Sequence, residues 1–258
     1  MNLSTEEIHQ ANKKRWDASA KNWAENADSR GIWQKCHEDP SLVFSNELLF
    51  YLKGVGDKRV CVLGSGDNEA VFALTGLGAD VTSVDISAEQ LAYAKERSEK
   101  LGLEIEFLQS DVTDLSALKD GSFDVVFTGG HVAVWVADLA SYYREAARIL
   151  RPGGLLFIEE YHPIRRIWKE SDSELVVGNS YYNRGPYKYM VDNNILYEKE
   201  GDLASFEFHW TISDMVNTVI QSNCEIVALD EYGESGESWE DAPMEGLPEQ
   251  FLIVAKKR

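Results

Sequence analysis

The sequence has few cysteines and no long hydrophobic run. The three cysteines, Cys36, Cys61 and Cys224, are odd in number and far apart, so neither a disulfide framework nor a zinc site is indicated. Apolar runs such as 155–158 are far too short to span a bilayer, and the polar N-terminus lacks the apolar segment of a secretion signal. We therefore expect a cytoplasmic protein that is not inserted in a membrane and holds no metal.

Basic residues are also scarce. There are 25 Lys and Arg against 44 Asp and Glu, which gives a net charge of −19. Between residues 200 and 255 there is no Lys or Arg, against thirteen acidic residues. Such a charge opposes binding to a polyanion unless a basic patch overcomes it, and the short basic groups at 13–15 and 165–166 have acids nearby. We therefore expect no nucleic-acid partner, and solubility is the simplest reason for the acidity.

What the sequence does contain is a nucleotide-binding pattern at residues 58–86, KRVCVLGSGDNEAVFALTGLGADVTSVDI. An apolar strand leads into a glycine turn and a short helix, and a second strand then ends on an acid. Gly64 and Gly66 lack the Cβ atoms that would obstruct a sharp turn and the approach of a ligand. Asp85 follows Gly64 by 21 residues, where a carboxylate can accept hydrogen bonds from both ribose hydroxyls. The pattern predicts a ligand that carries an adenosine.

The residues after the turn bear on whether that ligand also carries phosphates. Asp67 and Glu69 would repel a pyrophosphate at this helix N-terminus, and Asn68 stands where a third small residue is usual. A cation with an adenosine and no phosphate fits better, and S-adenosylmethionine is such a ligand. The alternative from another enzyme class is a nicotinamide-dependent oxidoreductase.

From Lys58 to Glu160 the chain resembles the class I S-adenosylmethionine-dependent methyltransferases, in particular the small-molecule branch typified by quinone-biosynthesis enzymes (methyltransferase type 11). Five motifs follow one another in the family's order: LGSGD, VDIS, QSDVTDL, FDVVFTGG and ILRPGGLLFIEE. The resemblance implies an α/β, Rossmann-like fold with a mainly parallel seven-stranded sheet and an antiparallel last strand. It also implies S-adenosyl-L-methionine as the cofactor and a small molecule as the methyl acceptor.

The resemblance assigns the cofactor contacts. Asp85, with Ile86 beside it, would hold the ribose, while the Asp111 side chain and the Val112 amide would contact the adenine. The remaining candidates are Trp23, in a WDASAKNW string that matches a family pattern, and the glycine-turn and fourth-strand residues Gly64, Ser65, Gly66, Asp67, Asn68 and Gly129. Two alternatives stay open, because Trp23 is also spaced to pack on the core with Trp16, and Asp111 can simply cap a turn.

Two residues depart from the family pattern. Val62 replaces an acid that helps to hold the methionine ammonium, and Asn68 replaces the third glycine. Asp67 and Asn68 offer oxygens that can supply a shifted contact with the amino group. A methyltransferase-like binding module without catalysis is the alternative.

One domain is expected for residues 1–258. It divides into an N-terminal helical cap (1–55), a cofactor-binding core (56–160), an insertion after the fifth strand (161–205), and a C-terminal helix with a β-hairpin (206–258). Ser4 and Glu7 predict a capping box for a helix over 4–25, and a second helix is expected over 40–52. The aromatic-rich insertion is predicted to close over the acceptor as a lid. A structural flap or a dimer contact is the alternative, although no pattern supports a homodimer.

Methyl transfer from a sulfonium is an in-line displacement that needs alignment and a dry site rather than a nucleophile on the enzyme. An acceptor hydroxyl, amine or carbon acid must nevertheless lose a proton. His162, just past the fifth strand, is the first candidate for that base, and His131, after the fourth-strand glycines, is the second. A structural role is the alternative for both histidines.

Overall fold

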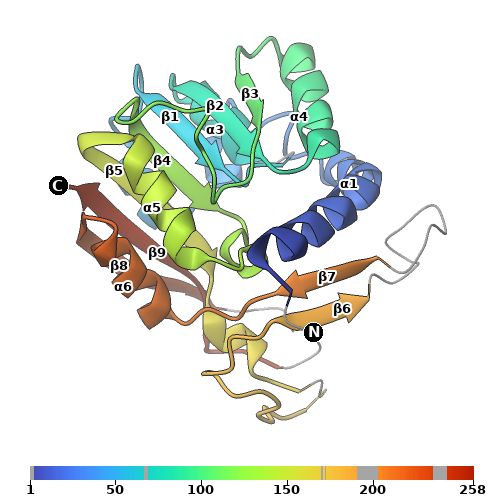
Figure 1. The fold of residues 1–258 in the computed structure, drawn as a ribbon. Helices are drawn as coiled ribbons and strands as arrows, with labels where there is room; N and C mark the ends of the chain where they lie inside the picture. Colours follow the sequence, from blue (N-terminus) through green and yellow to red (C-terminus); the bar gives the residue numbers. More distant parts are fainter. Residues whose placement is uncertain (1–2, 67–68, 170, 172, 191–202, 235–242) are drawn as a thin grey trace.

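The computed structural model describes residues 3–66, 69–169, 171, 173–190, 203–234 and 243–258 (Figure 1). A seven-stranded sheet forms its centre, with the strand order β3-β2-β1-β4-β5-β9-β8. Strand β9 is antiparallel to both β5 and β8, and the pairings among β1 to β5 are parallel. The predicted fold class, with an antiparallel last strand, is therefore confirmed. The strands are β1 (Arg59–Leu63), β2 (Asp80–Asp85), β3 (Glu106–Gln109), β4 (Phe123–Gly129), β5 (Leu150–Tyr161), β8 (Cys224–Glu234) and β9 (Pro248–Lys257).

Helices cover both faces of the sheet, which is why its central strands are almost wholly apolar. Helices α5 (Leu139–Ile149) and α6 (Ile212–Gln221) lie side by side over one face (Figure 1), where Tyr142 and Met215 join a single apolar cluster. The other cluster joins α2 (Asn46–Leu52) and α3 (Glu69–Gly76) to the sheet, and α4 (Ala88–Leu101) packs on β2 and β3. No helix in the described part of the chain is both long enough and apolar enough to cross a bilayer.

Helix α1 (Thr5–Arg30) carries the predicted capping box, with Ser4 and Glu7 bonded reciprocally, and it ends at Gly31 in the left-handed region. It is longer than predicted. The helix expected over 40–52 is instead two pieces, a 3-10 turn η1 (Pro40–Leu42) and α2. The break arises because Ser45 starts a helix of its own by accepting a hydrogen bond from the Leu48 amide at 3.1 Å.

The insertion contains a 3-10 turn η3 (Pro163–Arg166) and strand β6 (Tyr187–Met190), which pairs with β7 (Ala204–Glu207), a strand that runs two residues past the predicted end of the insertion. Strand β7 runs beside α1 (Figure 1). Asn12 of α1 fixes this contact, because its amide donates to the Phe206 carbonyl at 2.9 Å and its oxygen accepts from the Phe206 amide at 2.8 Å. The same amide donates at 3.0 Å to the carbonyl of Trp135 in the 3-10 turn η2 (Ala133–Trp135).

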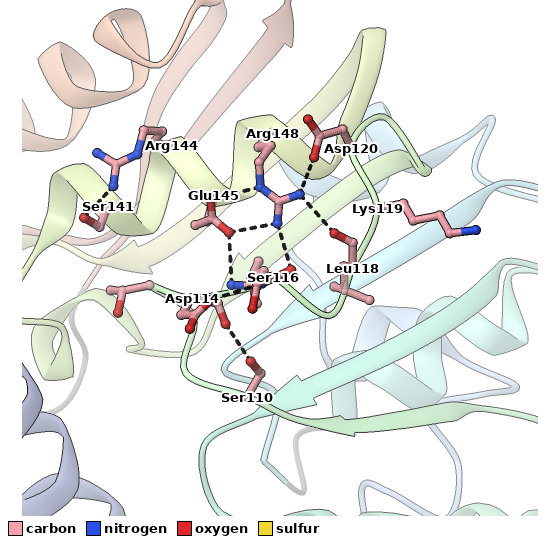
Figure 2. Close-up of polar contacts among 12 residues, drawn as sticks. Ser110, Asp114, Ser116, Leu118, Lys119, Asp120, Ser141, Arg144, Glu145 and Arg148 are labelled. Carbon is pink, nitrogen blue, oxygen red and sulfur yellow. Dashed lines mark hydrogen bonds and ion pairs between the residues drawn. The ribbon is translucent and has the colours of Figure 1, made fainter.

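Arg148 of α5 fastens the loop between β3 and β4, which carries two of the predicted cofactor residues (Figure 2). Its guanidinium donates to the carbonyls of Leu115 and Leu118 at 2.7 and 2.9 Å, and it pairs with Glu145 and Asp120. Hydrogen bonding to Glu145 is the largest cause of the raised pKa of Arg148. The loop is therefore tied to α5 at several points of its backbone.

Candidate functional site

A cavity of about 550 Å³ opens beneath α1 at the carboxyl ends of the central strands, where open α/β sheets bind their ligands. Its lining comes from α1, the glycine turn, the ends of β2 and β4, the loop after β3, and the insertion. Nine of the residues predicted from the sequence line it: Trp23, Gly64, Ser65, Gly66, Asp85, Ile86, Asp111, Val112 and His131.

Asp85 is held rigidly at the glycine turn. Its two carboxylate oxygens accept hydrogen bonds from the amides of Gly66 and Ser87, each at 2.8 Å, and the residue is only 9% exposed. The carboxamide oxygen of buried Gln90 also lies here and has no hydrogen-bond partner in the described part of the protein. A Cβ atom built on Gly66 would lie 3.7 Å from both the Asp85 and the Gln90 oxygen. Acceptor oxygens thus surround the space above Gly66, and they suit a ligand that donates hydroxyl protons.

Gly64 has a positive φ of 66°, and it lies against the loop after β4. A Cβ atom at this position would stand 2.5 and 2.7 Å from the two methyl carbons of Val132. Glycine is therefore required here for packing as well as for the turn.

Asp111 reaches the cavity, but its carboxylate is already engaged. One oxygen accepts from His9 Nδ1 at 2.7 Å, and the other accepts from the amide and the hydroxyl of Thr113. The Ala137 amide donates to His9 Nε2 at 2.9 Å, which places the His9 proton on Nδ1. Burial alone would raise the pKa of Asp111, but the hydrogen bonds from His9 and Thr113 outweigh it and lower the pKa. His9 was missed, although it lies seven residues before Trp16 and therefore on the same helix face.

Arg30 and Glu69 form an ion pair of 3.0 Å at the margin of the cavity near the glycine turn. Trp23 lies on the same helix as Arg30, lines the cavity and is 41% exposed. Its ring centroid is 5.9 Å from that of Trp16, so the two indoles form one aromatic wall. Of the two alternatives for Trp23, its exposure favours the cavity over the core.

A second group of residues lines the cavity toward the insertion. Arg166 bonds Nε2 of His131 and donates to Glu207 at 2.6 Å, and the Tyr161 ring lies edge-on to the imidazole at 5.0 Å. His131 has a left-handed backbone with φ of 80°, unusual for a residue with a Cβ atom. Burial, followed by the charge of Arg166, holds the pKa of His131 well below its ordinary value, so the imidazole is neutral at pH 7.

Two predicted residues lie elsewhere. His162 does not line this cavity, because its Nε2 pairs with Glu231 at 2.7 Å and its Nδ1 accepts from the Ile164 amide at 3.1 Å. Gly129 lines a neighbouring cavity of about 280 Å³, which shares Gly130 and Tyr161 with the first. The predicted residues 67 and 68 lie outside the described residues. Of the aromatic residues expected to form a lid, Tyr161 lines the cavity, whereas Tyr182 is 73% exposed.

Glu160, at the end of β5, supports the cavity wall from behind. It is 4% exposed, and its Oε1 accepts from the amides of Val132 and Ala133 at 3.1 and 3.0 Å. Burial raises the pKa of this carboxyl to about 7 despite those hydrogen bonds. Among the described residues no three His, Cys, Asp or Glu side chains are grouped so that they could hold a metal ion.

Comparison with known proteins gives a consistent answer. A family model described as a methyltransferase domain matches residues 61–158. The ubiquinone biosynthesis O-methyltransferase of Xanthomonas euvesicatoria pv. vesicatoria is 34% identical over 100 residues, which are 39% of this chain and 41% of that protein. The demethylmenaquinone methyltransferase of Thermus thermophilus is 30% identical over 149 residues, 53% of this chain and 66% of that protein.

The fold matches as well. The crystal structure of an S-adenosylmethionine-dependent methyltransferase from Mesorhizobium loti has a TM-score of 0.63 at 22% identity, covering 82% of this chain and 96% of that one. The matched segments of the two quinone-pathway relatives are about two fifths and two thirds of those proteins' lengths. The sheet order, the glycine turn with its acid, the domain match and these relatives agree: residues 61–158 match a methyltransferase domain, and the chain has the fold of the S-adenosylmethionine-dependent methyltransferases.

Proposed function

We propose that this protein transfers a methyl group from S-adenosylmethionine to a small-molecule acceptor. The observation that carries the proposal is the arrangement above Gly66. There the oriented Asp85 carboxylate and the unpartnered side-chain oxygen of buried Gln90 can both accept hydrogen bonds from hydroxyl groups of a ligand. A ribose presents two adjacent hydroxyls of that kind. Leaving a buried acceptor oxygen unsatisfied costs about 1 to 3 kcal/mol, and the ligand removes that cost.

The methionine portion of the cofactor is a zwitterion, and the Arg30–Glu69 pair offers both complementary charges. We assign its carboxylate to Arg30 and its ammonium to Glu69. Val62, which stands where the family often has an acid, is 2% exposed and lies within β1. Glu69 therefore replaces that acid from the start of α3.

We assign the adenine to the part of the cavity lined by Ile86 and Val112, beside Asp111. Both Asp111 oxygens already accept hydrogen bonds from His9 and Thr113, so we assign the adenine contact to the Val112 amide, which donates to a ring nitrogen. Asp111 then serves to hold the loop and α1 together at the adenine end.

When bound, S-adenosylmethionine supplies an electrophilic methyl group on its sulfonium. The protein's part is to align the acceptor and to exclude water. We assign the exclusion of water to α1 and to Tyr161, which line different sides of the cavity. Of the two candidate bases, His131 and His162, only His131 lines the cavity, so we assign proton acceptance to His131. The single lone pair of its Nε2 accepts from Arg166, whose charge opposes a second positive charge beside it. Nε2 therefore takes a proton only when that hydrogen bond is released, and the site favours an acceptor that ionises readily.

The acceptor is a small molecule in this proposal. Both curated relatives are named for quinone-pathway methyl transfer, and the net charge of −19 disfavours nucleic acid. A binding module without catalysis is the second candidate, because Val62 and Asn68 depart from the family pattern.

Incubation of the protein with methyl-labelled S-adenosylmethionine and a fractionated low-mass cell extract distinguishes the two. We expect label in a small molecule together with formation of S-adenosylhomocysteine. The control is Gly66→Val, in which the cavity is blocked and no label should move. Cofactor binding with no transfer in any fraction would support the binding module instead.

A further inference from the structure

Arg15 is a buried cation that makes no hydrogen bond in the described structure. The residue is 8% exposed, and its Nε and Nη1 atoms are buried without a hydrogen-bond partner. It nevertheless lines the cavity. A charged group that is buried without a hydrogen-bonded partner is costly, so such a guanidinium is uncommon unless a ligand completes it.

Two indoles hold the guanidinium in place. Its central carbon lies 4.1 Å from the ring centroid of Trp16 and 4.6 Å from that of Trp135. Trp16 and Trp135 pack edge-to-face at 5.2 Å, which fixes both rings. Contact with aromatic faces stabilises the cation but gives its in-plane N–H groups no hydrogen-bond acceptor.

The surrounding charges do not neutralise Arg15. Burial lowers its pKa to about 10, and the nearby Glu207 only partly opposes that effect. Glu207 is already in an ion pair with Arg166 at 2.6 Å. These three side chains therefore leave one positive charge in excess at this end of the cavity, in a protein whose net charge is −19.

Arg15 is also separate from the cofactor contacts. It lies fifteen residues before Arg30 on one helix, which corresponds to about 22 Å along the axis. Asp17 of the same helix bonds Ser87 beside the ribose acid at 2.6 Å. Two residues along a helix turn the side chain by about 200°, so Arg15 faces the opposite flank, toward Trp135 and Glu207.

We propose that Arg15 binds a carboxylate on the methyl acceptor, which makes the acceptor a flat organic acid whose ring or conjugated chain lies against Trp16 and Trp135. The proposal rests on the proposed function for the identity of the acceptor site, but the anion preference can be measured without it. Arginine binds a carboxylate through two parallel hydrogen bonds, and such a pair selects an acid strongly over its neutral amide.

The test uses three acids and their amides of nearly equal shape: benzoate with benzamide, cinnamate with cinnamamide, and hexanoate with hexanamide. Each is titrated calorimetrically into protein saturated with S-adenosylhomocysteine. The variants are Arg15→Gln, Arg15→Lys, and Lys14→Gln as the control, since Lys14 is the exposed neighbouring cation on α1. Circular dichroism checks that each variant folds, and Arg15→Lys keeps the test informative if Arg15→Gln does not.

We expect at least one flat acid to bind about tenfold more tightly than its amide. Arg15→Gln should remove that preference, Arg15→Lys should weaken it, and Lys14→Gln should retain it. Equal binding of every acid and its amide, or a preference that persists in Arg15→Gln, would overturn the proposal. A variant that loses S-adenosylhomocysteine while still preferring the acids would assign Arg15 to the cofactor and overturn it too.

Failure of the proposed function would give a different result from failure of the Arg15 proposal. If the wild-type protein does not bind S-adenosylhomocysteine, the cofactor assignment fails, and the acid and amide titrations are repeated on the unliganded protein. A preference for acids that depends on Arg15 would then still support the anion site, and its absence would reject it.

Discussion

Glu160→Gln should change how the stability of the protein depends on pH. The carboxyl is 4% exposed, and its pKa is raised by burial from 4.5 to about 7. The folded protein therefore binds more protons at this site than the unfolded chain between about pH 4.5 and pH 7. The stabilisation from the protonated carboxyl is fully present below pH 4.5, and it is lost as the pH rises through about 7.

The magnitude follows from that difference. At about 1.4 kcal/mol per pH unit, the interval from 4.5 to about 7 amounts to roughly 3 kcal/mol. Glutamine keeps the Oε1 atom that accepts from Val132 and Ala133 and does not titrate. The free energy of unfolding of Glu160→Gln, minus that of the wild type, should therefore rise by about 2 to 3 kcal/mol between pH 5 and pH 8.

Urea unfolding followed by circular dichroism at each pH measures this difference. The variant is needed because burial lowers the pKa of His209 to about 4 and also that of His131, and these shifts act in the opposite direction below pH 6.5. Both histidines are present in both proteins, so their contributions cancel. Glu104→Gln, which removes an exposed acid, is the control for lost negative charge. A difference between Glu160→Gln and the wild type that does not vary with pH would refute the reasoning.

Three further substitutions test the site and its support. Gly66→Val should abolish calorimetric binding of S-adenosylhomocysteine, because its side chain enters the cavity. A Cβ atom there meets nothing nearer than 3.7 Å, but the φ of 48° strains any residue other than glycine, so circular dichroism checks that the variant folds. Retained binding would refute the glycine-turn assignment. Gly64→Ala should lower the free energy of unfolding by about 1 to 3 kcal/mol, because its Cβ atom clashes with Val132. Adding Val132→Ala should restore part of that loss. No recovery in the double variant would mean that the backbone conformation alone causes the loss. Arg148→Met should lower the free energy of unfolding by about 1 to 3 kcal/mol, because it removes the hydrogen bonds that hold the loop before β4. An unchanged urea midpoint would contradict this role of Arg148.

The grouping of the residues that we assign to the cofactor was predictable from the sequence. The glycine turn, Asp85 and the Asp111–Val112 loop each follow a strand of a parallel sheet, and the carboxyl ends of such strands meet at one edge. Their spacing along the chain was therefore enough to bring them together.

The acceptor half was not predictable, because it depends on how α1 and the insertion lie over the sheet. Helical spacing groups His9 and Trp16 on one face of α1, but it does not show that a buried Arg15 reaches Trp135, 120 residues away. His162 was chosen for its place after β5. Successive residues of a strand point to opposite sides, and at this end Tyr161 faces the cavity while His162 turns toward Glu231 on β8.

The most direct test of the central claim is calorimetric titration of the wild-type protein and of Asp85→Asn with S-adenosylhomocysteine, with NAD as the comparison ligand. The wild type should bind S-adenosylhomocysteine and not NAD. Asp85→Asn should bind it more weakly by about 1 to 3 kcal/mol, because the oriented carboxylate that accepts from the ribose hydroxyls is lost. Binding of NAD without S-adenosylhomocysteine, or an unchanged affinity in a folded Asp85→Asn variant, would contradict the account.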